Sequence, residues 1–304
     1  MDKNRAFGAA ILTALAYGGT YPIAKSIMPE LIKPYGLTLA RVLGATALFW
    51  LISLWKPKEK VKLSDFFLLF VTSLCGASLN MLFLFKGLSY TSSINASIIV
   101  LLAPLFVSIN SFIFLREKLG IFKVAGLIIG LSGSVMIIWM SRDIDGVVNS
   151  SIKGDLLVMG SPFLYSIYLL LMGKLVQRYH LLTITKWSLL FGIFIIAPFG
   201  YRELLDAQWD KFSFSEYGGL LYVVVITSFL VVLMTLYAIK YIGASVFSVF
   251  MYLQPIFTIF IVSFMDMEAL GFIKITGMVL VFIGCYFVTN EDTLINKTKM
   301  KSIC

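Results

Sequence analysis

Eight polar side chains interrupt the long apolar runs of this 304-residue chain, and their chemistry suits recognition of an amphipathic solute. They are Tyr17, Thr20, Asn80, Asn95, Tyr165, Tyr168, Tyr252 and Gln254. Amides and phenols can orient a solute through hydrogen bonds without the large cost of burying a charge. The same side chains often form hydrogen bonds between packed helices instead. We predict that these eight residues bind a substrate, and interhelical hydrogen bonding is the competing interpretation.

The residues around Tyr17 add a second signal for binding. Gly18, Gly19 and Pro22 lie close to Tyr17 within one apolar stretch. A glycine–proline interruption of a membrane helix often marks a binding region. We therefore expect this part of the stretch to belong to the binding region.

Three cations lie deeper in apolar sequence than cations usually do. They are Lys25, Arg41 and Lys86. Arg41 either forms a cationic funnel for an anionic or carboxylate-bearing substrate or reaches the interface as an anchor, and the anchor is the favoured role. No Asp or Glu lies at clear mid-membrane depth, which argues against proton exchange through a buried carboxylate.

Enzymatic chemistry is not expected. An intramembrane enzyme would need a nucleophile with an acid and a base, or a set of metal ligands, and the apolar stretches contain no such cluster. Cys75, Cys285 and Cys304 have no metal-ligand spacing, and the single histidine, His180, falls in a loop. We predict no catalytic residue, no metal and no cofactor. An intramembrane enzyme and a non-transporting scaffold or receptor remain the alternatives to a carrier.

The elements that must position these side chains are transmembrane helices. The chain is 59% apolar and 13% charged, with a mean hydropathy of +0.93, which is far from soluble composition. A bilayer core of roughly 30 Å needs about 20 apolar residues per helix. Ten stretches of this kind occur at about 7–28, 35–55, 66–85, 93–115, 122–140, 154–174, 184–200, 216–238, 244–264 and 271–290. We predict an all-α integral membrane protein.

The second half of the chain repeats the first. Pro104, Glu117, Gly126 and Gly133 reappear 151 positions later as Pro255, Glu268, Gly277 and Gly284. The polar stretch 141–153 divides the repeats, which gives units at 1–142 and 151–290 and a short tail at 291–304. Because each unit contributes five helices, the second must enter the membrane from the opposite side. The sequence therefore predicts two inverted five-helix repeats.

The basic residues indicate the orientation of the chain. If alternate loops lie on alternate sides, 16 of the 25 lysines and arginines fall on the side of the N-terminus. The positive-inside rule then places both termini in the cytoplasm. We expect a multi-pass protein of the cell (inner) membrane, with the lipid bilayer as its surroundings and no nucleic-acid partner.

Two pairs of repeated residues have open roles. Pro104 and Pro255 fall near the middle of their predicted helices, where each frees a backbone carbonyl one turn back. They act either as hinges or as static kinks. Glu117 and Glu268 lie near the turns before the next helices, so a structural role in capping is favoured over proton coupling.

The repeated glycines form a third set. Gly126 and Gly133 share one face of a helix, as do Gly277 and Gly284. Small residues on one face allow another helix to approach closely. We predict a structural role for these four glycines, either at a homodimer interface or in a seam within the chain.

The repeat resembles a known family. The segment from Tyr90 to Ser97, followed by Pro104, Glu117, Lys123, Gly126 and Gly133, is similar to the EamA-type repeat of the drug/metabolite transporter superfamily, and so is the segment from Tyr241 to Gly284. The resemblance covers nearly the whole chain. It implies ten helices in two inverted repeats, peripheral fifth and tenth helices, and a substrate cavity between the stretches at 7–28, 66–85, 93–115, 154–174, 216–238 and 244–264.

These observations together favour a carrier. We predict that the chain moves a small metabolite, an amino acid or similar compound, by alternating access between the two repeats, with export as the expected direction.

Overall fold

The described part of the chain is α-helical. The structure, a computed structural model, describes residues 2–55, 59–115, 120–140, 151–243, 246–247, 250–251, 253–265 and 271–289, and these residues include no β-strand. The first half contains α1 (Asp2–Ile27), α2 (Pro34–Ser53), α3 (Leu63–Thr72), η1 (Ser73–Ser78), α4 (Leu79–Leu88), α5 (Ser93–Val100), α6 (Ala103–Leu115) and α7 (Ile121–Met140). The second half contains α8 (Ile152–Leu175), α9 (Leu181–Leu205), η2 (Trp209–Lys211), α10 (Phe214–Leu221), η3 (Tyr222–Leu230), α11 (Val231–Ile242), α13 (Leu253–Phe264) and α14 (Phe272–Thr289).

Many of these helices are long and apolar enough to cross a bilayer. Within the described residues, seven spans meet that standard by length and composition: Asp2–Ile27, Pro34–Ser53, Leu63–Leu88, Ser93–Phe114, Ile152–Leu175, Leu181–Leu205 and Phe214–Ile242. Shorter apolar segments lie in α7, α13 and α14. The chain is therefore a membrane-embedded, multi-pass, all-α protein. Each of the ten predicted stretches overlaps a described helix.

The helix α1 runs through the glycine–proline segment. It extends from Asp2 to Ile27 and includes Pro22. The glycines allow close contacts with the second half of the chain. A Cβ added at Gly18 would lie 2.8 Å from Phe257 Cβ and 2.9 Å from the Gln254 carbonyl oxygen. The Thr258 hydroxyl donates a hydrogen bond to the Gly18 carbonyl across this contact, at 2.9 Å.

The repeated prolines lie at helix starts. Helix α5 ends at Val100 and α6 begins at Ala103, so Pro104 lies in the first turn of α6, in the middle of the span Ser93–Phe114. Pro255 lies in the first turn of α13 in the same way. The Met251 carbonyl, one turn before Pro255, accepts a hydrogen bond from the Gln254 amide at 3.0 Å. A proline fits the first turn because its missing N–H has no helical partner there.

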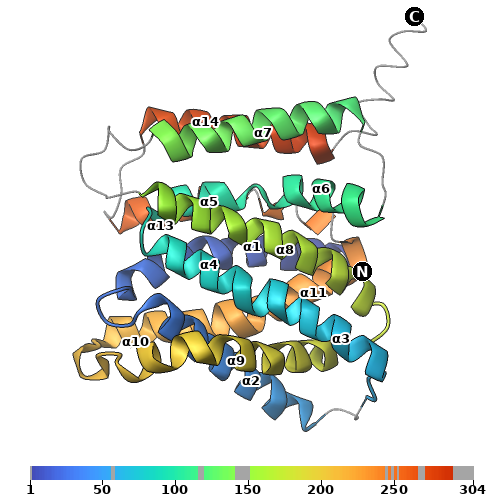
Figure 1. Ribbon diagram of the computed structural model, residues 1–304, viewed down its shortest axis with the longest axis vertical. Coiled ribbons are helices and arrows are strands. Elements are labelled where there is room, and N and C mark those ends of the chain that lie inside the picture. The colour runs from blue at the N-terminus through green and yellow to red at the C-terminus, as the bar shows by residue number, and fades with distance from the viewer. Residues whose placement is uncertain are drawn as a thin grey trace, which may run out of the picture.

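Two helices pack against each other along one edge of the molecule. α7 and α14 lie side by side at the top of the view in Figure 1. A Cβ on Gly133 would lie 2.8 Å from the Gly277 carbonyl oxygen, and one on Gly284 would lie 2.5 Å from the Gly126 carbonyl oxygen. The four predicted glycines therefore meet in a seam within the chain, where the two backbones are in contact.

Both helices of this pair begin after a glycine. Gly120 and Gly271 immediately precede α7 and α14, and their carbonyls accept from the Val124 and Ile275 amides at 3.1 and 3.2 Å. Glycine is acceptable at this capping position. The carboxylates predicted to assist there, Glu117 and Glu268, lie outside the described residues.

The remaining helices form the body of the molecule. α2 packs on α9, α4 packs on α8, and α1 contacts both α11 and α13 (Figure 1). Two spans contain π-helical stretches, η1 in the first half and η3 in the second. A π-helix inserts extra residues into the backbone spiral and is frequent at functional sites. Both stretches contribute residues to the cavity described below.

A candidate substrate cavity between the two halves

A cavity lies in the centre of the body, and residues from both halves of the chain line it. The space between its lining atoms is about 570 Å³, a value that includes the part of the cavity open to solvent. The first half contributes Tyr17 from α1, Arg41 and Val42 from α2, Gly76 and Ala77 from η1, and Met81 from α4. The second half contributes Tyr165, Tyr168 and Met172 from α8, Thr185, Ser188 and Leu189 from α9, Ser228 from η3, and Val232 and Thr235 from α11. We call this space the central cavity.

A second, more open cavity adjoins it and shares Tyr17, Met81 and Tyr165 with it. The space between its lining atoms, open solvent included, is about 330 Å³. Its other lining residues are Tyr21, Asn80, Leu84, Val100, Ser161, Pro162, Met251 and Gln254. The two cavities therefore form neighbouring parts of one region around Tyr17 and Tyr165.

Phenol rings and hydroxyl groups dominate the polar lining of the central cavity. The Tyr165 and Tyr168 rings stack with their centroids 5.5 Å apart and their planes inclined by 24°. The Tyr17, Tyr165 and Thr235 hydroxyls lie close to one another. Tyr165 Oη and Thr235 Oγ1 nevertheless have no hydrogen-bond partner at a suitable distance and angle. Buried hydroxyls in this state are suited to bind a solute's polar groups.

The structure brings most of the predicted binding residues together. Tyr17, Asn80, Tyr165, Tyr168 and Gln254 line one or both cavities. The other three residues of the predicted set differ. Thr20 is buried and donates to the Ala16 carbonyl of its own helix at 3.0 Å. Asn95 is fully buried in α5 and lines neither cavity, and Tyr252 lies outside the described residues.

The amide side chains at the second cavity also join helices. Ser161 Oγ of α8 donates to Asn80 Oδ1 of α4 at 2.5 Å. Tyr21 Oη of α1 donates to Gln254 Oε1 of α13 at 3.0 Å. Each bond links the two halves of the chain at the cavity wall. The two roles weighed from the sequence, solute binding and interhelical bonding, therefore coincide at these positions.

Arg41 was expected to be an interfacial anchor, and the structure shows otherwise. Its exposed fraction is 5%, and its side chain lines the central cavity. Nε donates to Ser228 Oγ at 2.8 Å, and the guanidinium carbon lies 5.2 Å from the centre of the Phe85 ring. The prediction failed because depth along the sequence does not tell which way a side chain points around its helix.

The other two deep cations lie away from the cavities. Lys25 donates through Nζ to the Thr91 carbonyl. Lys86 Nζ lies 4.9 Å from the centre of the Tyr90 ring and 5.4 Å from that of Tyr35. Its ammonium group lowers the pKa of the Tyr90 phenol by hydrogen bonding to it. These lysines therefore stabilise contacts near one end of the molecule.

The helices around the central cavity differ from those that the family resemblance implies. The resemblance omits the second and seventh apolar stretches, yet α2 and α9 contribute five lining residues. Thr185 and Ser188 of α9 are functional candidates that sequence reasoning missed. Their three-residue spacing places them on one helix face, and that is the signal by which they could have been found.

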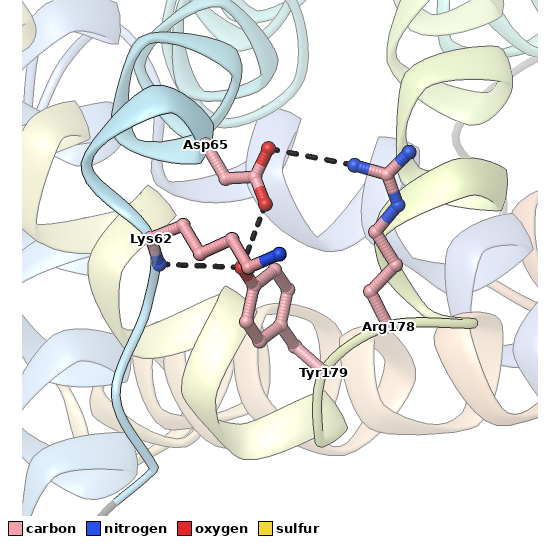
Figure 2. A network of polar contacts seen from close by, with 4 residues as sticks. All are labelled: Lys62, Asp65, Arg178 and Tyr179. Carbon is pink, nitrogen blue, oxygen red and sulfur yellow. Dashed lines mark hydrogen bonds and ion pairs between the residues drawn. The ribbon is translucent and has the colours of Figure 1, made fainter.

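At one end of the molecule, a polar network joins the start of α3 to the loop between α8 and α9. Figure 2 shows its four residues, Lys62, Asp65, Arg178 and Tyr179. Tyr179 Oη donates to Asp65 Oδ2 at 2.6 Å and accepts from the Lys62 amide at 3.3 Å. Arg178 Nη1 lies 3.5 Å from Asp65 Oδ1. The hydrogen bond to the Asp65 carboxylate raises the pKa of Tyr179.

At each end of the molecule, a glutamate carboxylate from one half of the chain accepts hydrogen bonds from backbone amides of the other half. Beside the Asp65 network, the His180 amide donates to Glu59 Oε2 at 3.0 Å, just before α9 begins. At the opposite end, the Tyr35 and Gly36 amides of α2 donate to Glu203 Oε2 at 2.7 and 3.1 Å. Carboxylates are favourable at helix N-termini because the amides there have no helical partner. The starts of α2 and α9 are thus held by acidic residues from the other half.

The described part of the chain contains no candidate metal site. No three or more of its His, Cys, Asp and Glu side chains lie together in a position to hold a metal ion. What the central cavity offers is a positive charge, hydroxyl donors and acceptors, and aromatic faces. This combination suits binding of an amphipathic solute.

The sequence profile of the EamA-like transporter family matches the chain twice, at residues 5–139 and 152–290. The chain belongs to the EamA-like transporter family. This family assignment makes it a membrane transporter of the drug/metabolite transporter superfamily, embedded in the bilayer and acting on a small molecule. The family resemblance predicted from the repeat is confirmed.

Relatives of this EamA-family chain have related names. An uncharacterized transporter of Archaeoglobus fulgidus is 27% identical over 286 residues, covering 92% of the chain and 96% of the relative. The uncharacterized transporter YetK of Bacillus subtilis is 22% identical over 291 residues, covering 95% of the chain and 88% of the relative. A solved crystal structure of another protein matches with a TM-score of 0.63 at 18% identity, covering 94% of this chain and 98% of the other. That structure supports the fold alone.

Proposed function

We propose that this transporter moves a small metabolite, an amino acid or similar compound, by alternating access through the central cavity. The main support for the proposal is that both family-matched segments contribute residues to the cavity wall. Tyr17, Arg41 and Gly76 come from the first family-matched segment, and Tyr168 and Ser188 come from the second. A cavity at the junction of two repeats is where carriers of this kind bind their substrates.

The two units, 1–142 and 151–290, are proposed to be inverted repeats of five helices each. Pairwise contacts support this relation. Gly133 meets Gly277 while Gly284 meets Gly126, which is the reciprocal pattern of a two-fold axis. α4 packs on α8 as α11 packs on α1. The π-helical stretches η1 and η3 also fall in equivalent places, since Ser78 and Phe229 are 151 positions apart.

Alternating access is supported by the contacts at the two ends. Glu203 holds the start of α2 at one end, and Glu59 holds the segment before α9 at the other. We call the contacts of Glu203 with Tyr35 and Gly36 the α2 latch. The contacts of Asp65 with Tyr179 and Arg178 form the α9 latch. Opening one latch at a time would expose the cavity to one side at a time.

The proposed location of the chain is the inner membrane of the cell. In the proposed orientation both termini lie in the cytoplasm. The proposed direction of transport is export. The excess of lysine and arginine on the N-terminal side supports the orientation. The α9 latch then lies at the cytoplasmic end of the cavity and the α2 latch at the outer end.

Transport itself is tested by flux into liposomes that contain the purified chain. We expect saturable uptake of at least one solute from a radiolabelled panel of amino acids, organic acids, sugars and nucleosides. Liposomes without protein give the background. The absence of saturable flux for every solute class would contradict the proposal and favour a scaffold or receptor.

The two latches give a paired prediction about the side from which the cavity opens. We expect Asp65→Ala to favour opening at the α9 end, and Glu203→Ala to favour opening at the α2 end. At the partly buried α2 latch, hydrogen bonds to a charged group contribute about 1.5–3 kcal/mol. The α9 latch is exposed and contributes less. Accessibility from the favoured side should therefore rise roughly threefold or more.

The reporter is a single cysteine at the cavity residue Ser188, in a chain whose native cysteines, Cys75, Cys285 and Cys304, are replaced by alanine. Labelling rates with a membrane-impermeant thiol reagent are measured in vesicles of both orientations. Changes in the same direction for both latch variants would rule out the assigned roles.

A further inference from the structure

The unusual feature of the central cavity is a buried positive charge without a negative partner. The Arg41 side chain is 5% exposed and forms no ion pair with any Asp or Glu in the described residues. Asp and Glu are also absent from the described lining of both cavities. A guanidinium keeps its charge at all physiological pH values. Burying it in a membrane-embedded site is costly unless an opposite charge or strong acceptors compensate.

The protein compensates the charge only in part. Arg41 Nε donates to Ser228 Oγ at 2.8 Å, and Nη1 donates to Met81 Sδ at 2.6 Å. A thioether sulfur is a weak acceptor. The guanidinium has five N–H donors, so three of them have no hydrogen-bond partner among the described residues. The Phe85 ring, 5.2 Å from the guanidinium carbon, adds a cation–π contact and no acceptor.

The surroundings of Arg41 indicate which chemical groups, besides a negative charge, a bound solute would have. Val42, Met81, Leu189 and Val232 give the cavity an apolar wall, and the stacked Tyr165 and Tyr168 rings give it an aromatic one. Inorganic anions would leave these surfaces without a contact. An organic solute with one anionic end and an apolar body would satisfy both parts of the cavity.

We propose that the central cavity binds an amphipathic organic monoanion, with a carboxylate or similar group at Arg41 and an apolar or aromatic body against Tyr165 and Tyr168. The proposal rests on the transport function above and narrows its substrate class to small metabolites with a net negative charge, which separates them from zwitterionic amino acids. It also makes the site unfavourable for organic cations, because Arg41 would repel them and the described lining offers no carboxylate to attract them.

The test uses three probes of the same shape that differ in charge: phenylacetate, phenylacetamide and phenethylammonium. Binding to the purified full-length chain is measured by the ligand-induced shift of its thermal unfolding midpoint over a millimolar concentration series. We expect phenylacetate to bind at least about tenfold more tightly than phenylacetamide, since charge-assisted bidentate hydrogen bonds are about twice as strong as neutral ones. Phenethylammonium should give no shift.

Two variants assign the preference to Arg41. In Arg41→Gln the difference between phenylacetate and phenylacetamide should disappear, and in Arg41→Lys it should persist in weakened form. The lysine variant also keeps the test decisive if the glutamine variant does not fold. Equal responses of the wild type to phenylacetate and phenylacetamide, including no response to either, would overturn the proposal.

Flux measurements separate this proposal from the transport function. Charge-selective binding that depends on Arg41, without flux of any panel solute, would support the anion site and contradict transport. Saturable flux that favours neutral or cationic solutes, or whose preference for anions survives Arg41→Gln, would support transport and overturn the anion site.

Discussion

Replacing Gly284 by leucine is expected to abolish stable folding of the chain. A Cβ at this position would already lie 2.5 Å from the Gly126 carbonyl oxygen and 2.5 Å from the Gly130 amide nitrogen. Both are backbone atoms, so no side-chain rotation can make room, and α7 and α14 must separate. Overpacking of a core costs typically 1–3 kcal/mol, and a clash with a whole helix should reach about 3 kcal/mol or more. The unfolding midpoint in detergent and the yield of monodisperse protein measure the effect.

The control for this variant is Gly173→Leu in α8. A Cβ at Gly173 would meet no atom within 4 Å. Leucine has a higher helix propensity than glycine by somewhat under 1 kcal/mol, so this control should melt at or slightly above the wild-type midpoint. If Gly284→Leu melted like Gly173→Leu, the seam between α7 and α14 would not be the close packing described above.

Replacing Gly76 by leucine is expected to abolish transport while the chain still folds. Gly76 lies in η1 at the wall of the central cavity, and a Cβ there would overlap the Tyr168 ring. Because the overlap is with a side chain, the ring can move aside, and the leucine and the displaced ring would then fill the cavity. We expect saturable flux in liposomes to fall at least about tenfold, with less loss of stability than in Gly284→Leu.

The same Gly173→Leu chain serves as the control, because Gly173 lines neither cavity and should leave flux unchanged. The unfolding midpoint of Gly76→Leu separates a blocked cavity from a misfolded chain. Flux at the wild-type level in a folded Gly76→Leu chain would show that solutes do not pass through this cavity.

The features that could be predicted from sequence are those fixed by spacing along a helix. Gly126 and Gly133 share a face because seven residues are close to two turns, and their repetition at Gly277 and Gly284 indicated a partner of the same kind. The sequence left open whether that partner was another chain. The structure answers the question through backbone contacts between α7 and α14.

The features that could not be predicted depend on how helices are rotated and where they end. The sequence favours an interfacial anchor for Arg41 because a long side chain can reach the interface, yet the rotation of α2 turns it into the central cavity. Pro22 lies inside α1 without ending it, whereas Pro104 follows a break between α5 and α6. Neighbouring helices decide such outcomes by supplying or withholding partners for the backbone.

Among the polar residues predicted to bind a substrate, those that the structure places at the cavities are large side chains in the middle of apolar stretches. Tyr17, Tyr165 and Gln254 line the cavities. Small hydroxyl residues such as Ser188 and Thr235 were overlooked because serine and threonine are frequent in all membrane helices, where they bond to the backbone of their own helix. Only the convergence of several helices distinguishes Ser188 from Thr20.

The most direct test of the account is whether the central cavity is the path of the solute and opens to each side in turn. The measurement is flux of a transported solute through the Ser188→Cys chain before and after reaction with a membrane-impermeant thiol reagent, applied to either face of the membrane. We predict that reagent from either face reaches the cysteine and that labelling stops flux. Undiminished flux after complete labelling, or reaction from one face only under all conditions, would contradict the account.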